Sequence, residues 1–232
     1  KCLEKPMNLP KVELIEGVHV VRDDLIQGGT KQRVIPGLLK GSDEFVYASP
    51  AYGYAQVALA YSCQSIGKQA TIFTAKRNKL HPLTLKAKQA GAKVVLIKPG
   101  YLSNVQAKAR AYCDFTGASY LPFGLNDERF VQAIADVARQ VKQNPSEVWT
   151  VAGSGVLTRA LQIRWPNAKF FAVQIGKDPK VGRAVLYKAP EKFEEDAKVR
   201  PPFPSCLNYD AKAWRFIKQY AGKNALFWNV AG

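Results

Sequence analysis

The sequence predicts an α/β protein in which parallel sheets are flanked by helices. From residue 44 onward, short apolar runs alternate with longer segments of helical pattern. Strands separated by helices of about 10–15 residues are typical of β-α-β crossovers, which make neighbouring strands parallel and cover both faces of the sheet. A chain of 232 residues is long enough to bury the core of one such domain, or of two small lobes packed together.

The individual elements follow from this alternation. Gly67 and Gly91 indicate helix ends, and Ser103 is expected to cap the helix that follows it. The proline-rich segment 178–205 breaks the alternation and is expected to form a long excursion or flap. The predicted strands are 45–49, 69–74, 93–97, 119–123, 147–152, 169–175 and 225–230, and the predicted helices are 52–66, the segment from Pro82 to Gly91, 103–115, 127–143, 156–164 and 209–221.

The positive charge of the chain is concentrated in one region. The formal net charge is +16, and no Asp or Glu lies between Glu44 and Asp114, whereas ten Lys and Arg residues do. A surface of one sign attracts polyanions, and phosphate contacts dominate nucleic-acid binding. The region is therefore either a nucleic-acid surface or a solvated basic face. The residues expected to contact nucleic acid are Lys76, Arg77, Lys79, Lys86 and Lys88.

Composition also argues against several other classes of protein. The apolar runs are shorter than the ~20 residues of a membrane span, and the polar segment 1–11 does not predict a signal peptide. The two histidines, His19 and His81, have neither metal-ligand nor catalytic-triad spacing. No Gly-x-Gly-x-x-Gly turn follows the first predicted strand, which argues against a nicotinamide-binding site. Cys2, Cys63, Cys113 and Cys206 show no metal or disulfide pattern, so we expect no metal and a reduced, cytoplasmic setting.

Four segments contain residues suited to binding a phosphorylated cofactor. The first is Arg-Asp-Asp-Leu-Ile-Gln-Gly-Gly-Thr-Lys-Gln-Arg at 22–33, where Gly28 and Gly29 would allow a close approach to Lys31. By itself this pattern also fits a turn followed by a solvated lysine. The second is Ala-Ser-Pro-Ala-Tyr-Gly at 48–53, between a predicted strand and a predicted helix, which is also a common way to end a strand.

The third and fourth segments lie in the second half of the chain. Val-Ala-Gly-Ser-Gly-Val-Leu-Thr at 151–158 leaves a predicted strand and opens a helix, where unpaired N–H groups and the helix dipole favour a phosphate. Asn-Tyr-Asp-Ala-Lys-Ala at 208–213 and the closing segment 225–232 complete the series. Tyr209 could equally be an aromatic residue packed at a helix start.

In this order, the four segments resemble the tryptophan-synthase-β-like, or fold-type II, pyridoxal-phosphate enzymes. The resemblance is nearest to the aminocyclopropanecarboxylate deaminase and D-cysteine desulfhydrase branch, and it covers the chain from about Val20 to Gly232. It implies a small basic lobe, 45–123, inserted in a larger cofactor-binding lobe made of 1–44 and 124–232. It also implies pyridoxal 5'-phosphate as cofactor, and a homodimer is one assembly that it allows.

The resemblance also implies roles for individual residues. Lys31 would bind the cofactor covalently and act as catalytic base or acid, and Tyr209 would act on the substrate amine or proton. The expected cofactor-binding residues are Lys31, Ser49, Tyr52, Gly53, Gly153, Ser154, Gly155, Val156, Leu157 and Asn229.

Four positions depart from the family pattern. Thr30 replaces an Asn, Pro50 a Gly, Ala51 the Asn that contacts the cofactor's phenolic oxygen, and Val230 the Thr that faces the pyridine nitrogen. In this chain the pyridine nitrogen would be unpaired, or would meet Asn229, Ser205 or Cys206.

The function implied is that of a lyase acting at the α carbon of an amino-acid group, as a decarboxylase or a deaminase. The positive charge suggests that the amino-acid group is attached to a polyanion, such as a DNA base. This substrate is handled by compact relatives of the family that accompany phage DNA-hypermodification genes. If a phage encodes the chain, the expected cytoplasmic setting is that of the host cell. The alternatives are a free-amino-acid deaminase or desulfhydrase, and a non-catalytic descendant that binds nucleic acid.

Overall fold

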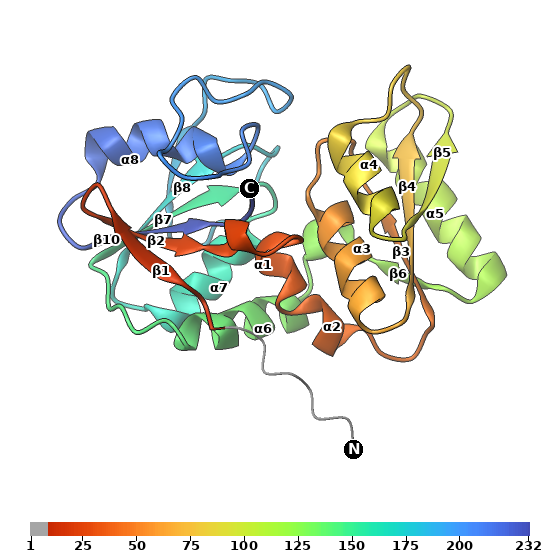
Figure 1. Cartoon of the computed structure of the whole chain (residues 1–232), viewed down its shortest axis with the longest axis horizontal. Helices are drawn as coiled ribbons and strands as arrows, with labels where there is room; N and C mark the ends of the chain where they lie inside the picture. Colours follow the sequence, from red (N-terminus) through yellow and green to blue (C-terminus); the bar gives the residue numbers. More distant parts are fainter. Residues whose placement is uncertain (1–8) are drawn as a thin grey trace.

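The computed structural model describes residues 9–232, and their strands form two sheets (Figure 1). Neighbouring strands are parallel except for the antiparallel pair β1 and β2, which confirms the predicted α/β class. The six-stranded sheet has the order β1 (Val12–Ile15), β2 (Val18–Arg22), β10 (Ala225–Asn229), β7 (Glu147–Ala152), β8 (Lys169–Gln174) and β9 (Val185–Lys188). The four-stranded sheet has the order β5 (Lys93–Ile97), β4 (Gln69–Ala75), β3 (Glu44–Ala48) and β6 (Ser119–Leu121).

Helices cover both faces of each sheet. The α-helices are α1 (Gly29–Gln32), α2 (Ile35–Leu38), α3 (Ala55–Ser65), α4 (Pro82–Gln89), α5 (Leu102–Thr116), α6 (Glu128–Arg139), α7 (Val156–Arg164) and α8 (Trp214–Tyr220), and the 3-10 turns are η1 (Asp23–Leu25), η2 (Phe123–Leu125) and η3 (Asp210–Ala213). Helices α3 and α4 lie on one side of the four-stranded sheet and α5 on the other (Figure 1). In the six-stranded sheet, α6 and α7 pack on one face and α8 on the other.

One apolar core joins the two sheets. It includes Tyr47 and Ile72 of the smaller sheet, Trp228 of the larger one, and Phe130 and Ile134 of α6. Residues adjacent in sequence alternate between the faces of each strand, so Phe227 packs in a second cluster on the α8 side. Because both faces are covered, the inner strands β2, β3, β4, β7 and β10 are buried along most of their length, as their apolar sequences predict, whereas the edge strands β1, β5 and β9 are not.

The strands predicted from residue 44 onward are present within about two residues of the expected bounds, but other expectations were wrong. No element was predicted before residue 44, where β1 and β2 form a hairpin through Glu16 and Gly17, both at positive φ. The excursion 178–205 contains the edge strand β9. The predicted helix 209–221 is divided into η3 and α8. Ser103 is not a cap, because α5 already begins at Leu102 and has no side-chain cap.

Two further expectations concern the ends and surroundings of the chain. Cys2 and most of the polar segment 1–11 lie outside the described residues. Among the described residues, no helix has the length and apolar character needed to cross a membrane. The smaller sheet is formed by strands between Glu44 and Leu121, and the division into lobes at 45–123 stays a prediction.

Gly29 is expected to be essential for the packing of α1 against the end of β10. Its φ is +67°, and a Cβ atom there would collide with the carbonyl oxygen of Val230. Gly117 also has a positive φ, +76°, but a Cβ atom there would meet nothing within 4 Å. Gly117→Ala should therefore cost only the left-handed backbone strain of about 1–2 kcal/mol. Gly29→Ala should cost about 1–3 kcal/mol more, because the backbone must shift.

The two free energies of unfolding are to be measured by urea denaturation. Equal losses of stability in the two variants would show that the contact between Gly29 and Val230 does not constrain the fold.

Candidate active site

A cavity of about 420 Å³ is lined by residues from both sheets. Its walls come from segments that are far apart in sequence, at the ends of β3, β7 and β10, in α1 and in η3. Parallel strands bring their carboxyl ends to one edge of a sheet, and ligands in such folds bind outside that edge. Of the residues predicted to contact the cofactor or the substrate, nine line this cavity: Lys31, Tyr52, Gly53, Gly153, Ser154, Gly155, Val156, Leu157 and Tyr209.

The lysine segment is held in place by the buried carboxylate of Asp23. Its oxygens accept hydrogen bonds from the Thr30 hydroxyl (2.7 Å), from Nε of Arg33 (2.9 Å) and from the indole N–H of Trp228 (3.0 Å). Arg33 also forms an ion pair with Asp23. Because these partners lie on both sides of Lys31 and on β10, they fix the backbone from which the Lys31 side chain enters the cavity.

The Lys31 side chain is half-buried, and its environment favours the neutral amine. Burial lowers the pKa of Lys31, and the nearby charge of Asp210 opposes that shift. A neutral amine is nucleophilic, whereas an ammonium group is not. The position therefore suits a lysine that forms a covalent bond to a carbonyl compound.

The turn Gly153-Ser154-Gly155 leaves β7 and enters α7. Gly155 has a φ of +86°, and a Cβ atom there would collide with the carbonyl oxygen of Lys180, so the segment after β8 lies directly on this turn. Within residues 9–232, the N–H groups of Ser154, Gly155, Val156 and Leu157 have no hydrogen-bond acceptor. Unpaired N–H groups at a helix N-terminus form an anion site. The residues thus fit a phosphate group.

Tyr209 lies against the same turn. The N–H of Gly153 donates a hydrogen bond to the Tyr209 hydroxyl oxygen at 2.7 Å. Burial raises the pKa of Tyr209 well above its ordinary value, and the negative charge of Asp210 acts in the same direction. Tyr209 therefore keeps its proton across the neutral pH range and can act as a proton donor inside the cavity.

Asp210 is a site residue that the sequence analysis missed. Its side chain is fully buried, lines the cavity, and has no hydrogen-bond partner of normal geometry among residues 9–232. Burial raises its pKa well above the ordinary value, while the N–H groups of Val230 and Ala231 and the charge of Lys31 oppose that shift. A buried polar group without a partner is rare in proteins and indicates a missing ligand or a catalytic role.

Two predicted cofactor contacts do not reach this cavity. Asn229 is fully buried, and its amide donates to Asp24 Oδ1 (2.8 Å) and to the Pro204 carbonyl (2.9 Å) while its oxygen accepts from Ser205 (2.8 Å). Its polar atoms are therefore used inside the protein, and neither it nor Ser205 lines the cavity, unlike Cys206. The Ser49 side chain is also buried, and this residue lines a neighbouring cavity instead.

Cations of the basic region lie over aromatic rings in five cases. Arg77 lies over Tyr52 (5.0 Å) and Lys86 over Tyr54 (5.3 Å), with Nζ of Lys86 also donating to the Tyr54 hydroxyl at 2.9 Å. The other pairs are Lys68 with Phe45, Lys93 with Tyr112, and Arg110 with Tyr120.

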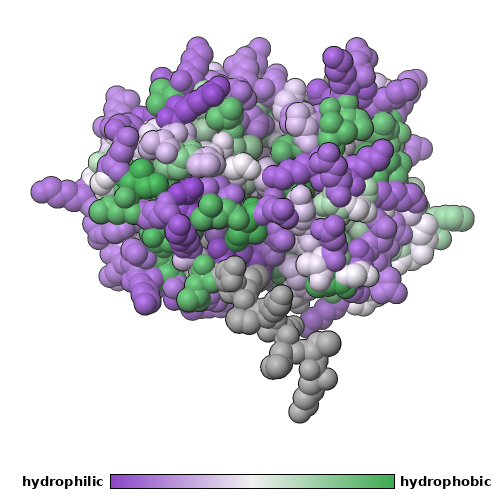
Figure 2. All heavy atoms as spheres, viewed as in Figure 1, coloured by the Kyte–Doolittle hydropathy of each residue, from purple (hydrophilic) through white to green (hydrophobic). Residues whose placement is uncertain are grey.

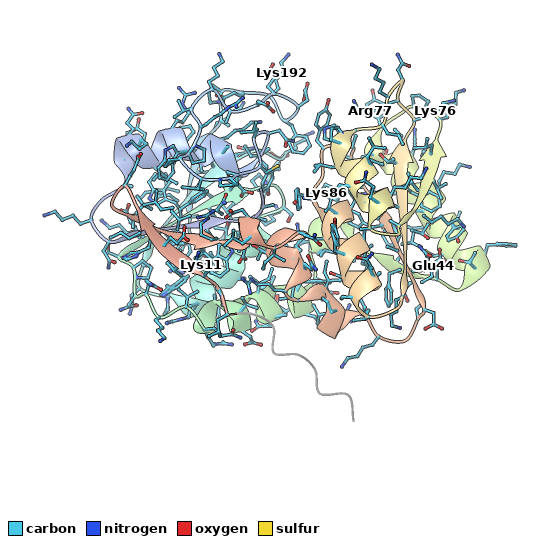
Figure 3. All side chains as sticks on the ribbon, viewed as in Figure 1. Lys11, Glu44, Lys76, Arg77, Lys86 and Lys192 are labelled. Carbon is cyan, nitrogen blue, oxygen red and sulfur yellow. The ribbon has the colours of Figure 1, made fainter. Side chains whose placement is uncertain are left out.

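The expected nucleic-acid residues do not form one outward-facing group. Lys86 is turned to the boundary between the two sheets, while Lys76 lies at the outer end of the smaller one (Figure 3). Lys76, Arg77, Lys79 and Lys88 are exposed. Hydrophilic residues cover most of the molecular face in Figure 2, with apolar residues in separate patches. The proposed nucleic-acid surface stays a prediction.

Tyr54 and Phe193 were also missed by the sequence analysis. Tyr54 follows the Ser-Pro-Ala-Tyr-Gly segment directly, lines the cavity, and its hydroxyl donates to the Gln27 carbonyl at 3.0 Å. Phe193 comes from the segment 178–205 and meets Tyr52 edge-on with ring centroids 5.9 Å apart. The sequence signal for Tyr54 is its place in the loop, whereas nothing in the sequence singles out Phe193.

The raised pKa of Asp210 predicts how its replacement changes the pH dependence of stability. Between the ordinary aspartate pKa and the raised value, the folded protein holds a proton that the unfolded chain has lost. The stability of the wild-type protein should therefore fall, relative to Asp210→Asn, as the pH rises through this window, and the difference should be constant below it. Urea denaturation of both proteins across the pH range measures this, and parallel curves would contradict the assignment.

Comparison with solved structures shows proteins of the same fold. An ACC deaminase homologue aligns with a TM-score of 0.77 and 16% identity over 98% of this chain and 95% of that chain. The processed threonine deaminase isoform 2 from Solanum lycopersicum has a TM-score of 0.71 and 15% identity, with 96% and 78% covered. The apo diaminopropionate ammonia lyase from Escherichia coli has a TM-score of 0.67 and 14% identity, with 100% and 84% covered.

No protein-family model and no curated protein matches the sequence. At identities this low, the structural likeness shows the fold alone. The chain has the tryptophan-synthase-β-like fold that the four sequence segments predict.

Proposed function

We propose that the protein is a pyridoxal-phosphate-dependent lyase that acts at the α carbon of an amino acid. The observation that carries this proposal is the pairing, in one cavity, of an amine with a lowered pKa at Lys31 and a fully buried carboxyl group with a raised pKa at Asp210. Lysine for covalent attachment, N–H groups for phosphate and a group for the ring nitrogen are the three requirements of this cofactor. When bound, the cofactor supplies an electron sink that weakens bonds at the α carbon of an attached amino group.

The residues of the cavity fit the cofactor part by part. Lys31 would hold its aldehyde carbon, and the turn Gly153-Ser154-Gly155 with the first residues of α7 would hold its phosphate. Val230 lines the cavity but has no polar side-chain atom, so we assign the ring nitrogen to Asp210 in place of the four options the sequence left open. An acidic group at that position would keep the ring nitrogen protonated, which strengthens the electron sink.

The proton chemistry falls to two side chains. Lys31, once released from the cofactor by an incoming amine, is suited to remove a proton at the α carbon because burial favours its neutral form. Tyr209 lines the cavity in its protonated form and is suited to donate its proton to a leaving group or to the substrate. Tyr209 also occupies the N–H of Gly153, so cofactor phosphate and Tyr209 compete for this donor.

The neighbouring proteins favour a deaminase or ammonia lyase acting on a free amino acid. Two of the three compared structures are named as a deaminase or deaminase homologue, and the third as an ammonia lyase. The finer hypotheses from the sequence are a decarboxylase and a substrate linked to a DNA base. Five cations of the basic region lie over aromatic rings of the protein itself, and these contacts do not favour a DNA-linked substrate. A free amino acid is therefore an equally good candidate substrate.

Lys31 should be the attachment point of the cofactor. The purified protein with added pyridoxal phosphate should be yellow, and borohydride reduction should fix the cofactor on Lys31, as detected by peptide mass spectrometry. Lys31→Ala should lose the visible band. Lys177, which also lines the cavity, provides the matched control, because Lys177→Ala should keep the band. Reduction onto Lys177 in the wild-type protein, or no cofactor uptake, would overturn the proposal.

Tyr209→Phe should separate cofactor binding from catalysis. The variant loses the proton donor, and general-acid catalysis of this kind contributes about 10²–10⁴-fold to turnover. It also frees the N–H of Gly153, so the affinity for pyridoxal phosphate should be unchanged or higher. Single-turnover kinetics and a cofactor titration measure the two effects. A variant with normal turnover would show that Tyr209 only packs against the turn.

A further inference from the structure

A second cavity of about 400 Å³ adjoins the candidate active site. The two cavities share four lining residues, Pro50, Tyr52, Leu102 and Phe193, and therefore adjoin at these residues. Tyr52 and Phe193 come from different parts of the chain and meet edge-on, and neither ring is fully buried. The second cavity thus adjoins the first on the side of Tyr52 and Phe193, where the far end of a long substrate could lie.

The second cavity contains a hydroxyl group without a partner. Thr74 is 2% exposed, lines the cavity, and its Oγ1 atom has no hydrogen-bond partner among residues 9–232. Ser49, which is fully buried, lines the same cavity. A buried hydroxyl that lacks a partner costs about 1–3 kcal/mol. The cost is recovered if a ligand atom accepts the hydrogen bond of Thr74.

Arg77 supplies a positive charge at the same cavity. Its guanidinium group lies over the Tyr52 ring, 5.0 Å from the ring centroid. Because the face of the guanidinium makes this contact, most of its N–H groups remain able to donate hydrogen bonds in the plane of the group. In Figure 3, Arg77 lies at the top of the part of the molecule that holds the smaller sheet.

The donors outweigh the acceptors that face this space. Among residues 9–232, Glu194 is the one carboxylate in the lining, and it is exposed on the segment 178–205. The walls from the smaller sheet carry no acidic residue, because none occurs between Glu44 and Asp114. Guanidinium and hydroxyl donors arranged around one space are the usual partners of carboxylate and phosphate oxygens.

We propose that the second cavity is a subsite for an oxyanion at the far end of the substrate side chain. This inference rests on the proposed function, because it assigns the α-amino end of the same molecule to the first cavity. The substrate class is then an amino acid whose side chain ends in a carboxylate or a phosphate. Arg77 and Thr74 are the residues that recognise this end, and the pair Tyr52 and Phe193 contacts the chain between the two ends.

The test compares two probes that differ in their distal group, racemic 2-amino-5-phosphonopentanoate and racemic norleucine. The holoenzyme should bind the phosphonate at least about tenfold more tightly, since hydrogen bonds to charged groups contribute about 1.5–3 kcal/mol. Arg77→Ala should remove this preference. Arg110→Ala is the matched control, because Arg110 also lies over a tyrosine ring in the same region, at 4.8 Å from Tyr120, but lines neither cavity.

Thr74→Val separates recognition from packing. If the hydroxyl serves only the fold, its replacement by a methyl group should leave probe binding unchanged. In the proposed role, the variant should be as stable as the wild type or more so, because an unpartnered hydroxyl is removed, yet should bind the phosphonate several-fold more weakly. Unchanged phosphonate affinity in Thr74→Val would remove Thr74 from the subsite.

Two further measurements identify the source of the oxyanion and separate failure of the subsite proposal from failure of the proposed function. Phosphorus NMR of the phosphonate, with and without added cofactor, reports on the subsite, while the visible band reports separately on cofactor binding. Displacement of the phosphonate by a short oligonucleotide, lost in Arg77→Ala, would assign the subsite to a nucleic-acid phosphate; no displacement would assign it to a free amino acid. Equal binding of both probes, or equal effects of Arg77→Ala and Arg110→Ala, would overturn the proposal.

Discussion

The geometry of the candidate site depends on the buried carboxylate of Asp23. It is fully buried and receives hydrogen bonds from Thr30, Arg33 and Trp228. A buried charge is tolerated only when it is paired and its hydrogen bonds are satisfied, and removing one partner is strongly destabilising. Because Thr30 and Arg33 lie on either side of Lys31 and Trp228 lies on β10, this one group fixes the lysine relative to the central strands. The neighbouring Asp24 extends the same arrangement to Arg22 and Asn229.

The same arrangement explains what the sequence could and could not predict. The strands that were predicted after residue 44 are apolar runs separated by helical segments, whereas the edge strand β9 is largely exposed and was not predicted. The segments of Lys31 and Gly155 stand out in the sequence because their glycines allow a close backbone approach. The sequence could not show that Asp210 lines the cavity and that Asn229 does not. Both are polar residues near the end of the chain, and only the fold shows that Asn229 is held by Asp24 and Pro204 while Asp210 has no hydrogen-bond partner of normal geometry among residues 9–232. The hairpin of β1 and β2 was missed because both strands are short and because the burial of β2 depends on its pairing with the distant strand β10.

Two departures from the sequence pattern become intelligible in the structure. Thr30 stands where the family pattern has Asn, and its hydroxyl both donates to Asp23 and receives the indole N–H of Trp228 at 3.0 Å. The hydroxyl at this position therefore supports the lysine segment, and the residue also lines the cavity. Val230 replaces a polar residue at the cavity wall, and the carboxyl group of Asp210 provides a polar atom in the same cavity. The loss of a ring-nitrogen partner at one position is thus compatible with its supply from another element.

The contrast between Asp23 and Asp210 separates the structural part of the site from its chemical part. Both carboxyl groups are fully buried, yet Asp23 is saturated with donors and Asp210 has none of normal geometry among residues 9–232. In natural proteins, buried polar groups lack hydrogen-bond partners mainly at functional sites, where a bound ligand supplies the partner. The orphaned hydroxyl of Thr74, in the cavity that adjoins at Tyr52 and Phe193, has the same character. Among the buried groups without a partner in residues 9–232, Asp210 and Thr74 are two that line the adjoining cavities, and we propose that they lie at the reacting centre and at the distal end of the substrate.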